Sequence, residues 1–132
     1  MTGEAAMNTR RILLVDDDDT IREVAQLTLE AVGGYQVVTA TGGAEGVAKA
    51  TAEQPDAILL DMMMPGMDGP TTAAHLQASE STRAIPVVLL TAKTAVIDRS
   101  DWDRLGVVGV IGKPFDPMQL PDQVASALGW AS

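Results

Sequence analysis

Cysteine is absent from the 132-residue sequence, which excludes disulfide bonds and thiolate metal sites and fits a reducing, cytoplasmic location. The sequence also has no run of about 18 apolar residues, so no membrane-spanning helix is expected. The first residues lack the basic and then apolar pattern of a signal peptide. Residues 1–9 are therefore expected to form a flexible leader.

Basic residues are few: nine Lys and Arg stand against 18 Asp and Glu, which gives a formal net charge of −9. Because binding to nucleic-acid phosphates depends on clustered Lys and Arg, a nucleic-acid partner is not expected. Proteins or cations are the expected partners. A chain of this length has room for one folded domain, which we expect over residues 10–129.

Short apolar runs alternate along the chain with segments that have the apolar spacing of helices. The runs predict strands at residues 11–15, 35–40, 57–61, 85–90 and 107–111. The helical segments lie near residues 20–32, 44–50, 70–78, 94–105 and 117–128. This alternation indicates an α/β fold, a doubly wound and flavodoxin-like (βα)5 sandwich whose five-stranded parallel sheet has the order 2-1-3-4-5.

Two helix starts carry a specific expectation. Thr20 or Asp19 is expected to cap the first helix, and Asp18 to be a solvated or capping residue. In the last helix, Pro121 lacks the N–H that a helical ladder needs. The first turn of that helix should therefore be irregular, with the regular helix beginning near Leu120 or Pro121.

Chemical groups follow four of the five predicted strands. The third strand ends on Asp61, and the groups at the other strand ends are Asp16, Asp17, Thr91 and Lys113. In open α/β sheets, ligands bind beyond the carboxyl ends of the strands, where the strand order reverses. The first and third strands are neighbours at that point, so their carboxylates should converge.

The converging carboxylates predict a divalent metal site. They would repel one another without a cation, and hard oxygen ligands favour Mg²⁺ or Mn²⁺. We expect Asp17 and Asp61 to bind the ion directly and Asp16 to act through a water molecule. The backbone carbonyl of Met63 is expected to complete the protein ligands.

Asp61 is also the expected nucleophile, because a carboxylate can form an aspartyl phosphate. During phosphoryl transfer, negative charge spreads over the transferring oxygens and must be neutralised. The metal ion, the Lys113 ammonium and the Thr91 hydroxyl are the groups predicted to do this.

Together these motifs resemble the receiver domain of bacterial two-component response regulators. The resemblance covers residues 10–128 and is carried by Asp16–Asp17, Asp61–Gly69, Thr91–Ala92 and Lys113–Phe115. It implies that Asp61 accepts a phosphoryl group from a histidine kinase or a histidine phosphotransfer protein in a Mg-dependent reaction. It further implies a stand-alone, chemotaxis-regulator-like switch, not an enzyme, and a cis peptide bond between Lys113 and Pro114.

One position departs from the pattern of the family. Many receivers carry Tyr or Phe three residues before the lysine, whereas this chain has Val110, which has no ring to move and few χ1 options. We therefore expect phosphorylation to reorganise residues 91–97 and the helix that bears Trp102, with Val110 nearly static. The expected face for a downstream protein target comprises the helix 94–105, the strand 107–111 and the helix 117–128.

Two other functions remain open. A metal-dependent phosphohydrolase with an Asp nucleophile often has a second carboxylate two residues later as general acid–base, and Met63 at that position counts against turnover. A phosphorelay intermediate is the other alternative. The nearby methionines are expected to pack the loop; they are Met62, Met63, Met64 and Met67.

Overall fold

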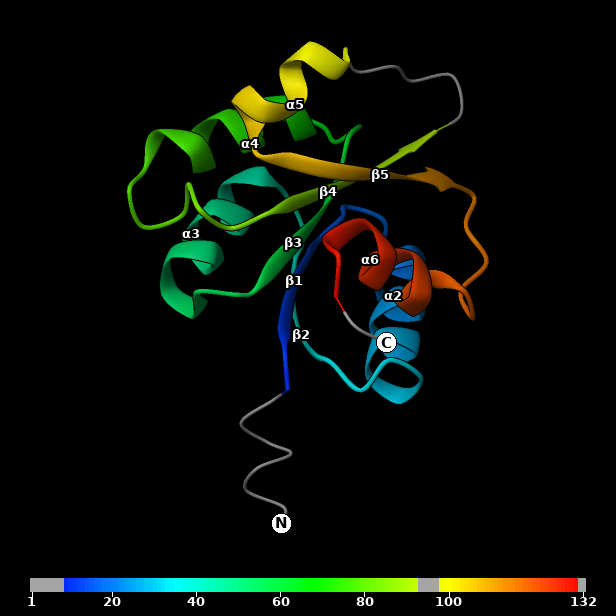
Figure 1. Ribbon diagram of the computed structural model, residues 1–132. Coiled ribbons are helices and arrows are strands. Elements are labelled where there is room, and N and C mark those ends of the chain that lie inside the picture. Colours follow the sequence, from blue (N-terminus) through cyan, green and yellow to red (C-terminus); the bar gives the residue numbers. More distant parts are fainter. Residues whose placement is uncertain (1–8, 93–97, 131–132) are drawn as a thin grey trace.

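The computed structural model describes residues 9–92 and 98–130, in which a five-stranded sheet lies between two layers of helices (Figure 1). The strands are β1 (Arg11–Val15), β2 (Gln36–Ala40), β3 (Ala57–Asp61), β4 (Val87–Ala92) and β5 (Val107–Lys113). The helices are α2 (Asp19–Ala31), α3 (Gly43–Glu53), α4 (Gly69–Ala78), α5 (Arg99–Leu105) and α6 (Leu120–Leu128). Every strand pair is parallel and the order is β2-β1-β3-β4-β5, so the predicted doubly wound fold is confirmed.

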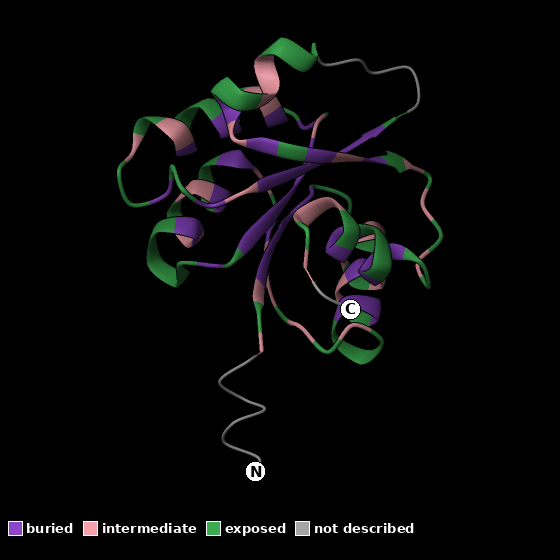
Figure 2. Cartoon of the chain, in the orientation of Figure 1, coloured by how far each residue is buried: buried purple, intermediate pink, exposed green. Residues whose placement is uncertain are grey.

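Alternate residues of the central strands face the two helix layers. On one face, Leu13 of β1 and Ile58 of β3 pack against α3, α4 and α5. On the other face, Leu14 and Leu59 pack against α2 and α6. All residues of β3 are buried, which explains its continuous apolar run (Figure 2). The last residue of that buried strand, Asp61, is consequently held at a fixed place on the sheet edge.

The start of α2 differs from the sequence-based expectation. Neither Thr20 nor Asp19 caps the helix; Asp18 has an extended backbone, and its carboxylate accepts a hydrogen bond of 3.0 Å from the Ile21 N–H. Asp18 lies one residue before the helix, so its carboxylate reaches the free amides of the first turn. This arrangement confirms the capping role allowed for Asp18.

Elements near the carboxyl edge also differ in length. The strand expected at 107–111 continues to Lys113, because Gly112 and Lys113 pair with Thr91 and Ala92 of β4. The last regular helix begins at Leu120 with Pro121 in its first turn, which confirms the irregular start that was expected. The predicted helix 94–105 is present from Arg99 onward, and its first part overlaps residues outside the described ranges.

The predicted leader lies almost entirely outside the described residues. Within residues 9–92 and 98–130, none of the helices has the length and apolar character that crossing a membrane would require.

Candidate functional site

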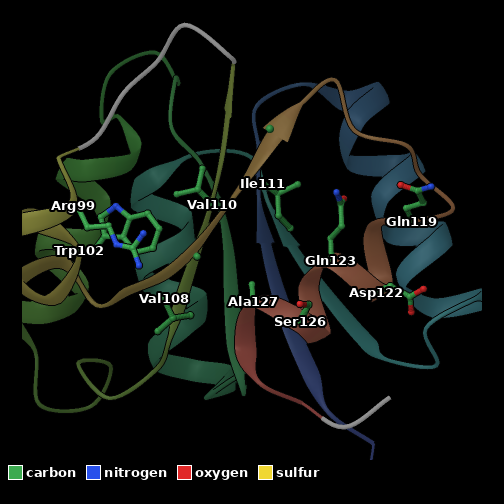
Figure 3. A pocket seen from close by; sticks show the side chains of 12 residues that line it. Arg99, Trp102, Val108, Val110, Ile111, Gln119, Asp122, Gln123, Ser126 and Ala127 are labelled. Carbon is green, nitrogen blue, oxygen red and sulfur yellow. The ribbon is translucent and has the colours of Figure 1, made fainter.

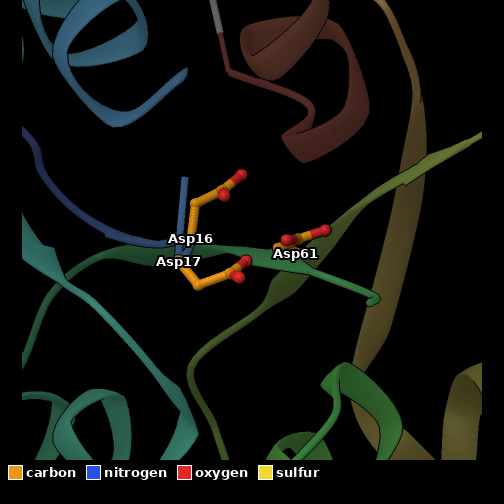
Figure 4. A group of neighbouring side chains, drawn as sticks. All are labelled: Asp16, Asp17 and Asp61. Atoms are coloured by element: carbon orange, nitrogen blue, oxygen red, sulfur yellow. The ribbon is translucent and has the colours of Figure 1, made fainter. Parts of the chain in front are cut away.

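Buried acidic groups and one lysine meet where β1, β3 and β5 end. Asp16 directly follows β1 and is 0% exposed, and Asp61 ends β3 and is 4% exposed. Lys113 ends β5, and its side chain reaches across the sheet edge to both carboxylates. Figure 4 shows Asp16, Asp17 and Asp61 gathered at the ends of the strands.

Strand pairing accounts for this convergence. The β1–β3 ladder pairs Val15 with Leu60, so the next residue on each strand, Asp16 and Asp61, lie side by side. The Asp16 backbone N–H donates to the Ala40 carbonyl at 3.2 Å, which fixes the end of β1 against β2. The register of the sheet therefore determines which carboxylates meet.

Lys113 is the cation that faces the two buried carboxylates. Its Nζ donates to Asp16 Oδ2 at 2.9 Å and lies 3.0 Å from Asp61 Oδ1. Burial alone would lower the pKa of Lys113, but the hydrogen bonds and charges of Asp16 and Asp61 outweigh it and raise that pKa. Lys113 is accordingly held in its charged form.

Asp61 experiences the opposite balance. Burial raises its pKa, and the negative charge of Asp16 raises it further, while Lys113 and the Met63 N–H only partly oppose this. The Met63 N–H donates to Asp61 Oδ1 at 3.3 Å, so the loop after β3 folds back over the carboxylate. The site thus has more negative than positive charge, and an additional cation would stabilise the ionised Asp61.

The three carboxylates satisfy the requirements of such a cation. Asp16, Asp17 and Asp61 each offer an oxygen within 4.8 Å of the others. All of these ligand atoms are hard oxygens, and Asp17 is exposed, so water can complete the coordination shell. The residues present therefore fit Mg²⁺.

Thr91 lies at the end of β4 and is buried. Its Oγ1 is 3.2 Å from the Ala92 carbonyl and 3.3 Å from Sδ of Met62. Sequence reasoning placed Thr91 at this edge but missed its contact with Met62. The β3–β4 register contains the signal, because pairing of Asp61 with Leu90 puts Met62 next to Thr91.

Val110 lies on β5 away from the acidic cluster. Together with Trp102 it packs against the core and lines an open groove of about 670 Å³ between α5, β5 and α6 (Figure 3). The Arg99 guanidinium lies 4.4 Å from the centre of the Trp102 ring. The buried Trp102 indole N–H has no hydrogen-bond partner within the described part of the chain. The residues 93–97 that were expected to reorganise lie outside the described ranges.

Two other sequence-based expectations can be compared with the structure. The peptide bond between Lys113 and Pro114 is cis, as expected. The methionines of the β3–α4 loop differ among themselves: Met64 is buried in the core, Met63 is 68% exposed, and Met62 contacts Thr91. The prediction that these methionines pack the loop is therefore confirmed for Met64 and wrong for Met63.

Comparison with known proteins gives a consistent family. The response regulator receiver domain family model matches residues 12–125. The DNA-binding dual master transcriptional regulator RpaA of Synechocystis is 38% identical over 89% of this chain and 48% of that protein. The response regulator PleD of Caulobacter vibrioides is 43% identical over 88% of this chain and 25% of that protein. The chain thus spans about half the length of RpaA and about a quarter of the length of PleD.

Solved structures are similar over nearly their whole length. The chemotaxis protein CheY4 of Vibrio cholerae has a TM-score of 0.81 and 30% identity, covering 90% of this chain and 98% of that one. The receiver domain of the sensor histidine kinase PA1611 of Pseudomonas aeruginosa, with magnesium in its active-site cleft, has a TM-score of 0.78 and 30% identity over 92% and 98%. Sequence, strand order and site geometry agree, and the chain belongs to the response regulator receiver domain family.

Proposed function

We propose that this chain is a phosphorylation-switched signalling domain in which Asp61 accepts a phosphoryl group from a histidine kinase or a histidine phosphotransfer protein. Receiver domains are signalling switches of two-component systems, in which Mg²⁺-dependent phosphorylation of an Asp is characteristic. The observation that carries the proposal is the buried Asp61 carboxylate, 3.0 Å from Lys113 Nζ and grouped with Asp16 and Asp17. We assign the domain to residues 10–129, which contain the ten described helices and strands from β1 to α6.

In this reaction an Asp61 oxygen attacks phosphorus. The Lys113 ammonium and the Met63 N–H both contact Oδ1, so Oδ2 is the oxygen that we assign to the attack. The new O–P bond forms as the N–P bond to the donor histidine breaks, and the imidazole nitrogen keeps the electron pair. Lys113 then pairs with the oxygens of the phosphoryl group, and the Thr91 hydroxyl donates to one of them.

The metal ligands of the proposal are those of the acidic cluster. Asp17 and Asp61 would bind Mg²⁺ directly, Asp16 through water, and the Met63 carbonyl would be the remaining protein ligand. A bound Mg²⁺ supplies positive charge that offsets the charge on the transferring oxygens. Mn²⁺ has the same preference for oxygen ligands and is expected to substitute.

The output surface of the proposal is the groove between α5, β5 and α6. The chain has a formal net charge of −9, which favours a protein over a nucleic acid as the downstream target. We expect Val110 to stay nearly static while residues 91–97 and α5 rearrange. The buried Trp102 N–H has no partner among residues 9–92 and 98–130, which supports movement of α5, because a state that supplies an acceptor to a buried donor is favoured by about 1–3 kcal/mol.

Incubation with Mg²⁺ and acetyl phosphate, followed by intact-protein mass measurement, tests the function. One added phosphate per chain is expected, together with slow release of inorganic phosphate. Rapid multi-turnover release would instead support the phosphohydrolase, for which the Met63 side chain offers no proton. An unchanged mass would contradict the proposal.

A further inference from the structure

The Met62 thioether lies next to the Thr91 hydroxyl because of the β3–β4 register. Asp61 pairs with Leu90, and the Met62 N–H donates to the Leu90 carbonyl at 2.9 Å, so the ladder continues one residue beyond β3. Met62 and Thr91 therefore occupy neighbouring positions at the edge, and Sδ lies 3.3 Å from Oγ1.

The other flank of Thr91 carries no side chain. On β5 its paired residue is Gly112, and a Cβ atom there would meet no heavy atom of the described residues within 4 Å. Of the two residues that flank Thr91 across the sheet, only Met62 therefore has a side chain that can hold its hydroxyl. Met63 and Met64 are unsuited to this role, since one is exposed and the other is buried in the core.

We propose that Met62 is a positioning residue that holds the Thr91 hydroxyl in the unphosphorylated state, a role that rests on the proposed function. A hydroxyl has one proton, so Thr91 cannot donate to Sδ and to a phosphoryl oxygen together. A thioether is a weak acceptor, whereas a charged phosphoryl oxygen is a strong one. Phosphorylation therefore exchanges a weak bond for a strong one, and Met62 sets the free-energy difference that the exchange must overcome.

Two substitutions at this position should act in opposite directions on affinity for beryllofluoride, a phosphoryl mimic, measured with Mg²⁺ present. Met62→Leu keeps the side-chain volume but removes the sulfur acceptor, so the protein should bind the mimic about two- to threefold more tightly. Met62→Gln places an amide beside Thr91, which bonds the hydroxyl more strongly than sulfur does. Its affinity should be about fivefold lower than that of the unsubstituted protein.

A double-mutant cycle separates positioning from packing. In a Thr91→Val background, which keeps the shape but removes the hydroxyl, the substitutions at Met62 should no longer change affinity. Met118→Leu is the matched control, because it makes the same chemical change at an exposed methionine of the β5–α6 segment and should leave affinity unchanged. Thermal unfolding of each variant verifies folding, and Met62→Leu alone suffices if Met62→Gln does not fold.

The outcomes distinguish a failure of the role of Met62 from a failure of the proposed function. Opposite shifts that vanish in the Thr91→Val background support the role of Met62. If the unsubstituted protein binds the mimic and Met62→Leu binds it equally or more weakly, Met62 does not restrain Thr91. If the unsubstituted protein does not bind the mimic at all, the proposed function fails and the role of Met62 fails with it.

Discussion

The two edges of the parallel sheet use the same kinds of charged residues in different surroundings. At the amino edge, Arg11 Nη1 lies 3.4 Å from Glu53 Oε1, with side chains 40% and 43% exposed, and Asp56 accepts the Arg11 N–H at 2.7 Å. At the carboxyl edge, Lys113 is 18% exposed and pairs with carboxylates that are nearly inaccessible. Exposure, more than residue type, separates the two edges.

This difference explains why only one edge is suited to chemistry. Solvent screens the amino-edge pair, which is worth about 0–1 kcal/mol and can only help to hold the fold. At the carboxyl edge, burial strengthens every electrostatic interaction, and acids outnumber the single lysine that contacts them. The uncompensated negative charge there would favour a bound cation, and it is the edge at which we propose Asp61 as the nucleophile.

The largest expected effect is the loss of phosphorylation in Asp61→Asn, because an amide cannot act as the nucleophile. Asp56→Asn at the amino edge is the matched control and should be phosphorylated normally. Intact-protein mass after treatment with acetyl phosphate and Mg²⁺ measures both variants. Phosphorylation of Asp61→Asn, or failure of Asp56→Asn to become phosphorylated, would contradict the distinction between the two edges.

Next in size is the effect of removing each basic residue on stability. Without Mg²⁺, Lys113→Met should lower the free energy of unfolding by about 3 kcal/mol, since it leaves two buried carboxylates without their cation. Arg11→Met should cost less than about 1 kcal/mol. Urea unfolding at neutral pH measures both losses, and equal losses would contradict the assigned role of burial. Addition of Mg²⁺ should restore part of the stability lost in Lys113→Met and none of the stability lost in Arg11→Met.

Asp61→Asn should raise the melting temperature by a few degrees in the absence of Mg²⁺. Burial and Asp16 raise the pKa of Asp61 above its ordinary 3.8, so ionised Asp61 is less favourable in the folded state than in the unfolded state. Stability from this group is present at low pH and is lost as pH rises through the raised pKa. The advantage of Asp61→Asn should therefore shrink as pH is lowered toward about 4. A variant that is less stable than the unsubstituted protein at neutral pH would contradict this balance.

The smallest effect concerns Glu45, an exposed acid near the carboxyl end of β2. Hydrogen bonds from the Thr41 N–H and hydroxyl, with Lys49 nearby, lower its pKa from 4.5 to about 2. Its contribution to stability is present above pH 4.5 and is lost as pH falls toward 2. Because Glu45 is exposed, Glu45→Gln should cost less than about 1 kcal/mol at neutral pH. In this variant the free energy of unfolding should also depend less on pH between 4.5 and about 2. If stability falls between pH 4.5 and about 2 as steeply in Glu45→Gln as in the unsubstituted protein, these hydrogen bonds do not stabilise α3.

Local sequence was sufficient to predict most of the fold and the positions of the site residues. The run Ala57–Asp61 is apolar until its final carboxylate, and this abrupt change marks both a buried strand and its end. Helix periodicity and glycine or proline boundaries supplied the alternation from which the strand order followed. Asp61, Thr91 and Lys113 were expected at strand ends, and they lie there.

The details that sequence reasoning missed depend on contacts between distant segments. Asp16 is buried and bonded to Lys113 whereas Asp17 is exposed, although the two residues are adjacent and chemically identical. Likewise, the sequence allowed Asp18, Asp19 or Thr20 as the cap, and the choice of Asp18 depends on its backbone angles. The contact between Met62 and Thr91 depends on strand register, which residue types alone do not specify.

Mapping the phosphorylated residue tests the central claim most directly. After treatment with acetyl phosphate and Mg²⁺, borohydride reduces an acyl phosphate to an alcohol, and tandem mass spectrometry of the peptides then identifies the residue that carried it. We predict conversion at Asp61 alone, with none at Asp16, Asp17 or Asp56. Conversion at any of those three residues with Asp61 intact would contradict the assignment of Asp61 as the phosphoryl acceptor.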